Sequence, residues 1–156
     1  MWFVRYNFSR MKMERKKTMI RQLSIFAENR KGTMNRITQI LADNEVNMNT
    51  LITNDSAEFG IIRMLVSDSE KAAKALSEAG YLCHIDFVVA AEIGDDCGCL
   101  NAMLTALSRA NINLDYLYVT YSSLSKLPVA ILKATDLMEI EDFLAGKGYH
   151  MLERLA

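Results

Sequence analysis

An internal duplication constrains the fold of this chain more than any other feature of its sequence. When the sequence is shifted by 66 residues, Gly32 falls on Gly98, and the residues around the two glycines keep a similar pattern of apolar and polar positions. The matched pairs are Glu28 with Gly94, Asn29 with Asp95, Leu41 with Leu107, Val46 with Ile112, Asn47 with Asn113, Met48 with Leu114 and Leu51 with Leu117. A repeat this long has the size of a small domain. The 156 residues therefore predict two similar domains, at 19–86 and 87–156.

Hydrophobic periodicity predicts the same order of elements in both copies. In the first copy we expect strands over 20–27, 48–53 and 59–66, a helix over 33–44, a turn at 54–56, and a second helix that residues 67–70 cap and Gly80 ends. One strand over 81–93 ends this copy and begins the next, without a linker. The second copy has helices over 99–110 and 137–145 and strands over 113–121, 127–132 and 149–155.

The element order in each copy is therefore βαββαβ. This order predicts an α+β fold of two ferredoxin-like units, each with an antiparallel four-stranded sheet and both helices on one face. Pro128 cannot donate a backbone hydrogen bond, so we expect the strand that contains it to lie at a sheet edge.

A polar loop between the first strand and the first helix is the best candidate for a binding site. In the first copy this loop ends at Gly32, where the helix begins. A helix N-terminus offers free backbone N–H groups and the positive end of the helix dipole, which suit a carboxylate or another small anion. An ordinary turn, with glycine supplying an unusual backbone angle, would also explain one such loop. The return of the loop at Gly98 favours a binding site.

Charge separates the first 18 residues from the rest of the chain. They carry six Lys and Arg residues against one Glu, whereas the whole chain has a net charge of −1. We expect a disordered basic tail or a start codon assigned too early; an arm that contacts RNA, a membrane or a partner is the alternative. The balanced total charge does not suggest nucleic-acid binding, and no apolar run is long enough to span a membrane.

The cysteines and histidines indicate neither a disulfide framework nor a metal centre. The chain has three cysteines, Cys83, Cys97 and Cys99, and an odd number fits a reducing, cytoplasmic compartment. Cys97 and Cys99 could form a redox pair, or hold a soft metal ion with help from Cys83, His84 or His150, but the spacing of typical metal-ligand pairs is missing. We therefore predict no metal, no cofactor and no catalytic residue.

The segments 28–32 and 46–48 resemble an ACT domain, and the duplication resembles the small tandem ACT proteins. The resemblance covers about residues 20–155. It implies ferredoxin-like modules that bind amino acids and regulate metabolic enzymes. In the serine-sensing members, an Asn in the loop after the first strand and an Asn that opens the second strand hold the ligand at a domain interface. These residues match Asn29 and Asn47 here, and Asp95 and Asn113 in the second copy.

The resemblance implies a non-enzymatic amino-acid sensor with a set of candidate ligand-binding residues in each copy. These residues are Asn29, Arg30, Lys31, Gly32 and Asn47 in the first copy, and Asp95, Asp96, Cys97, Gly98 and Asn113 in the second. The expected partners are a small amino acid, a second copy of the chain in a homodimer, and an enzyme of amino-acid biosynthesis. Two alternatives are an interaction subunit that docks on such an enzyme without binding a ligand, and a small enzyme on the same fold.

Overall fold

The computed structural model describes residues 18–53 and 59–156, and it confirms the α+β fold of the chain. The expected basic tail, apart from Thr18, and the expected turn at 54–56 lie outside the described residues. The chain divides into two compact units at the junction of Asp86 and Phe87, and the described residues 18–20 group with the second unit. This junction falls inside a single strand, β4 (Leu82–Glu92). Within the described ranges, no helix is long and apolar enough to cross a membrane.

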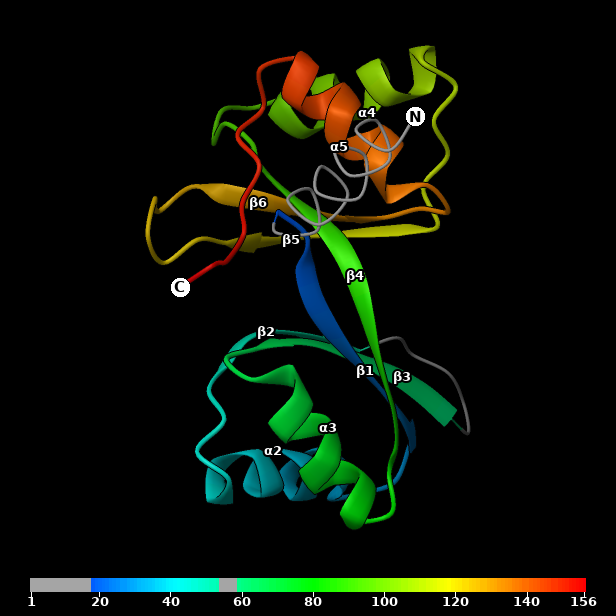
Figure 1. Cartoon of the computed structure of the whole chain (residues 1–156), viewed down its shortest axis with the longest axis vertical. Helices are drawn as coiled ribbons and strands as arrows, with labels where there is room; N and C mark the ends of the chain where they lie inside the picture. The colour runs from blue at the N-terminus through cyan, green and yellow to red at the C-terminus, as the bar shows by residue number, and fades with distance from the viewer. Residues whose placement is uncertain (1–17, 54–58) are drawn as a thin grey trace, which may run out of the picture. The chain divides into compact units, whose positions relative to one another are not determined.

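The described residues of the first unit form three strands and two helices. They are β1 (Ile20–Glu28), α2 (Thr33–Asp43), β2 (Met48–Thr53), β3 (Phe59–Val66) and α3 (Ser69–Glu78). The first residue of β1 groups with the second unit. Both β1 and β2 pair antiparallel with β3, so β3 lies between them in the sheet. Figure 1 shows α2 and α3 on the same face of these strands. Leu23 and Ile25 of β1 alternate onto this face and form a buried core with Ile37 of α2 and Leu76 of α3.

The second unit repeats this arrangement with the remaining elements. They are α4 (Cys99–Arg109), β5 (Tyr116–Tyr121), β6 (Pro128–Lys133) and α5 (Leu137–Gly146), together with the second half of β4. Strand β6 pairs antiparallel with both β4 and β5. Figure 1 shows α4 and α5 together on one face of β5 and β6. Their buried residues Met103, Leu107, Ile140 and Leu144 form the core with alternate residues of the strands.

Three details of the second unit differ from the expectations. The expected edge position of the strand with Pro128 is wrong, because β6 lies between β4 and β5. Proline is tolerated there because it is the first residue of the strand, where its carbonyl still accepts a hydrogen bond from the Ile93 N–H. Strand β5 begins at Tyr116, three residues later than expected. The expected strand over 149–155 is reduced to a bridge between Met151 and Ala91, with a flanking hydrogen bond from Leu152 N–H to Ala90.

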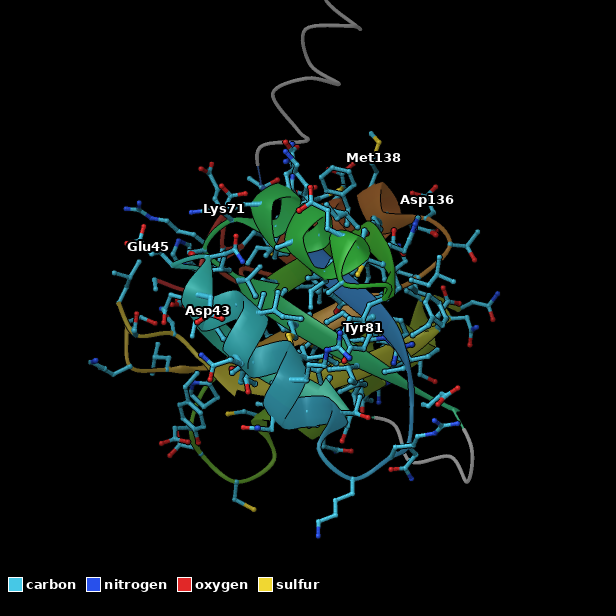
Figure 2. All side chains as sticks on the ribbon, turned by 90° about the horizontal axis from the view of Figure 1, so that it is seen from below. Asp43, Glu45, Lys71, Tyr81, Asp136 and Met138 are labelled. Carbon is cyan, nitrogen blue, oxygen red and sulfur yellow. The ribbon has the colours of Figure 1, made fainter. Side chains whose placement is uncertain are left out.

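The four helices of the described residues begin in two different ways. At the start of α3, the Asp68 carboxylate accepts a hydrogen bond from the Lys71 N–H at 2.9 Å. At the start of α5, the Asp136 carboxylate accepts hydrogen bonds from the N–H groups of Met138 and Glu139 at 3.0 Å each; Figure 2 labels Asp136 and Met138 at this end. These are ordinary side-chain caps. Helices α2 and α4 instead begin at a glycine, which has no side chain to cap the helix.

Candidate functional site

The loops that precede α2 and α4 have the same backbone geometry. Gly32 has φ 88° and ψ −8°, and Gly98 has φ 94° and ψ −8°. In both loops the first helical N–H, of Thr33 or Cys99, donates to the carbonyl three residues before it at 3.2 Å. Because no side chain caps these helices, the other N–H groups of the first turn stay available to an anion. The sequence repeat therefore corresponds to a repeated backbone structure.

In the first unit, the loop forms one wall of an open groove with a volume of about 720 Å³. Phe26, Ala27, Glu28, Arg30, Lys31, Gly32, Thr33, Arg36, Ala79, Gly80, Tyr81 and Leu82 line this groove. The groove thus brings the N-terminus of α2 together with the C-terminus of α3 and the residues that follow it. Figure 2 shows Tyr81 away from Asp43 and Glu45, which mark the other end of α2.

Positive charge dominates the lining of this groove. Three of its charged side chains are basic, and only Glu28 is acidic. Arg30 and Glu28 form an ion pair, with 2.6 Å between Nε and the carboxylate oxygen. Lys31 and Arg36 form no ion pair with another described residue, and both are exposed. Two cations therefore remain for an anionic ligand.

The structure does not bring Asn29 and Asn47 together within the first unit. Asn29 follows Glu28, which pairs with Phe59 at the start of β3. Asn47 precedes Met48, which pairs with Val66 at the end of β3. Phe59 and Val66 are seven residues apart along β3, which is about 24 Å at the usual rise per residue of a strand. Asn29 and Asn47 therefore lie at opposite ends of the sheet.

Asn47 is held in place chiefly by its backbone. Its N–H donates to the Ser67 Oγ at 3.0 Å, and its carbonyl accepts from the Ser67 N–H at 2.9 Å. The Asn47 side-chain amide donates to the Asn49 side-chain oxygen at 3.2 Å. The side chain is thus presented from a fixed backbone at the start of β2.

The second unit separates its candidate residues in the same way. Asp95, Asp96 and Cys97 are exposed in the loop before α4, whereas Asn113 lies beyond the far end of this helix. Asn113 lines a shallow depression of about 390 Å³ together with Ser108 and Asn111. Helix α4, which has 11 residues and is about 16 Å long, separates the loop before it from Asn113.

The loop before α4 also differs from the first loop in its packing. A Cβ atom added at Gly94 would lie 2.7 Å from the Cys99 Sγ, so the thiol would have to shift to admit a side chain at this position. The matching position in the first copy is Glu28, which forms the ion pair with Arg30. The two loops therefore share a backbone but present different side chains.

A second polar cluster lies at the end of β4 in the second unit. The Glu92 Oε2 is 2.7 Å from the Nδ1 of His150, and the Glu92 N–H donates to the His150 carbonyl at 2.9 Å. Hydrogen bonds from Ser125 and His150 lower the pKa of Glu92. The other carboxylate oxygen of Glu92 is buried without a partner among the described residues. This cluster ties the C-terminal segment to β4.

Among the described residues, no group of three or more His, Cys, Asp or Glu side chains could hold a metal ion.

Sequence reasoning identified only Arg30, Lys31 and Gly32 among the residues that line the groove, and Arg36, Gly80 and Tyr81 are among those that it missed. Arg36 was identifiable, because its N–H closes the first helical hydrogen bond to Gly32 and it therefore lies one turn beyond the loop. Gly80 and Tyr81 carry no comparable signal. They reach the groove only because α3 packs beside α2 over the core, which local patterns do not show.

A family model described as an ACT domain pair matches residues 18–138 of the chain. No curated protein matches the chain. A solved structure of a protein from Bacteroides thetaiotaomicron is similar over 86% of this chain and 92% of its own, with 29% sequence identity and a TM-score of 0.80.

Two further solved structures are regulatory subunits of aspartate kinase. The subunit from Thermus thermophilus, in a ligand-free form, has 13% identity and a TM-score of 0.59 over 81% of this chain and 91% of its own. The subunit from Thermus flavus has 14% identity and a TM-score of 0.55 over 81% and 90% of the two chains. At these identities, the likeness shows a shared fold.

Proposed function

This chain belongs to the family of ACT domain pairs, and we propose that it is a non-enzymatic regulatory protein that binds a small amino acid and modulates an enzyme of amino-acid metabolism. The observation that carries the proposal is the repeated loop, in which Gly32 and Gly98 open two helices with nearly identical backbone angles and no side-chain cap. Each loop offers helix N–H groups to the carboxylate of an amino acid. The side-chain amide of Asn29 can donate to the same carboxylate or accept from the ammonium group.

The separation of the paired asparagines supports a site that two domains share. A small amino acid is much shorter than the roughly 24 Å between Asn29 and Asn47 in one unit. One ligand can contact both residues only if they come from different domains. We propose that a second copy of the chain supplies the other half of the site, in a cytoplasmic homodimer. Asp95 would repel a carboxylate and favour an ammonium group, so the two loops should differ in affinity.

Calorimetric titration of the wild-type chain and of three variants tests this proposal. Asn29→Ala and Asn47→Ala should each weaken binding about tenfold or more, because each removes one partner of a polar contact. Asp95→Ala should change the amino-acid affinity of the site at the second loop and leave that of the first loop unchanged. Gln39→Ala is a matched control, because it removes an exposed amide in the middle of α2 that donates to the Asp43 carboxylate in the same helix.

Two outcomes would contradict the proposal. If the wild type and all variants bind alike, the site lies elsewhere. If the wild type binds none of the twenty amino acids, the chain is an interaction subunit without a ligand, and co-purification from cell extract should then identify the enzyme on which it docks.

A further inference from the structure

We propose that the groove of the first unit selects an amino acid with an acidic side chain, that is, a ligand with two carboxylates. This inference rests on the proposed function and specifies the class of ligand. It follows from the two helix ends that meet in the groove, from the cations that line it, and from the contrast with the second loop.

The groove lies between helix ends of opposite partial charge. Gly32 and Thr33 belong to the N-terminus of α2, which carries partial positive charge, and Ala79 and Gly80 belong to the C-terminus of α3, which carries partial negative charge. An amino acid has a carboxylate and an ammonium group next to each other. Its carboxylate therefore fits the α2 end, and its ammonium group fits the α3 end.

The groove has more cationic side chains than are needed to bind an amino acid with a neutral side chain. The N–H groups at the start of α2 can bind the carboxylate next to the ammonium group without help from a basic side chain. Glu28 offsets Arg30, with which it pairs at 2.6 Å. Lys31 and Arg36 remain, and both belong to the loop and first turn that line the groove. A second carboxylate on the ligand would lie near both and would gain charge-assisted hydrogen bonds.

The matching positions of the second loop carry no cation. A shift of 66 residues takes Arg30 to Asp96, Lys31 to Cys97 and Arg36 to Ala102. The helix start and its glycine geometry are the same in both loops, so the two loops differ in their side chains and not in this part of the backbone. The preference for an acidic ligand is therefore a property of the first unit only.

The remaining walls leave room for a longer side chain. Phe26, Tyr81 and Leu82 supply apolar surface, and Phe26 and Leu82 are exposed at 43% and 68% of their areas. The volume of about 720 Å³ falls within the range of ordinary small-molecule pockets. The groove can therefore accept glutamate as readily as aspartate.

Titration with matched ligands tests the class of ligand directly. Glutamate and aspartate should bind at least tenfold more tightly than glutamine and asparagine, which have almost the same shapes but lack the second charge. Succinate has two carboxylates and no ammonium group, and inorganic phosphate is a plain anion; both should bind more weakly than glutamate. Raising the ionic strength should weaken glutamate binding, because the cations are exposed.

Variants then locate the preference on the groove. Arg36→Gln and Lys31→Gln should each weaken glutamate binding about five-fold, the effect of one exposed charge near the ligand, and should leave glutamine binding nearly unchanged. Lys71→Gln is the matched control, because Lys71 is an exposed lysine at the opposite end of α3 (Figure 2). All three positions are exposed, so the variants should fold normally.

The outcomes separate this inference from the proposed function. If glutamine binds as tightly as glutamate, the inference is wrong and the amino-acid sensor stands. If succinate or phosphate binds as tightly as glutamate, the groove is a general anion site and the inference is wrong. If Lys71→Gln weakens glutamate binding as much as Arg36→Gln, the acidic ligand binds outside this groove. If no amino acid binds, the proposed function itself fails.

Discussion

Replacing Gly32 by alanine should destabilise the first unit through backbone strain alone. Gly32 has a φ of 88°, a conformation that costs a residue with a Cβ atom about 1–2 kcal/mol. A Cβ atom at this position would meet no atom within 4 Å, so steric contact adds nothing. With an m-value of about 2 kcal/mol per M in urea, the midpoint of unfolding should fall by about 0.5–1 M.

Gly146→Ala is the matched control for this prediction. Gly146 is the last residue of α5, does not have a positive φ, and also leaves open space for a Cβ atom. Alanine there should stabilise the helix, by up to about 0.5–1 kcal/mol. Far-UV circular dichroism in urea measures both variants. Gly32→Ala should unfold at a lower urea concentration than both the wild type and Gly146→Ala. If it does not, the loop does not require a left-handed backbone conformation at residue 32, and the proposed reason for the glycine at the start of α2 is wrong.

Three further predictions concern stability. Asp68→Ala should lower the free energy of unfolding by about 1 kcal/mol in a thermal or urea melt, because it removes the cap of α3; an unchanged melt would contradict the capping role. Ile37→Ala should cost about 2–5 kcal/mol, since Ile37 is fully buried in the first core, and a loss below 1 kcal/mol would show that this core is loosely packed. Glu92 has a folded pKa below its ordinary value of 4.5, so its contribution is present above that pH and is lost as the pH falls through the folded pKa. Glu92→Gln should therefore flatten the acid side of the stability curve below about pH 4.5, and an unchanged pH dependence would contradict the role of the His150 and Ser125 hydrogen bonds.

The sequence allows most of the fold to be predicted, because local signals agree in both copies. Alternating apolar residues place β1, and the carboxylates of Asp68 and Asp136 mark the starts of α3 and α5. Pro128 misleads because a missing N–H suggests an edge strand, whereas the position of proline within the strand decides whether a hydrogen bond is lost. Strand order is a tertiary property that one residue does not reveal.

The candidate site is harder to predict than the fold. The repeat identifies both loops and their glycines, because each lies between a strand and a helix in sequence. The groove, however, depends on Gly80 and Tyr81, which lie almost fifty residues after Gly32 and reach it through helix packing. The large separation of Asn29 from Asn47 likewise follows from strand register, which the sequence pattern does not fix.

Nuclear magnetic resonance of the chain labelled with ¹⁵N-glycine tests the central claim most directly. The chain has seven glycines, so their amide signals should be well resolved. During titration with an amino acid that binds in the first groove, the amide signals of Gly32 and Gly80 should shift until the site is saturated. The signal of Gly146, at the end of α5, should stay unchanged. The account is contradicted if none of the twenty amino acids shifts Gly32 or Gly98, or if the shifts are confined to Gly146 and Gly148.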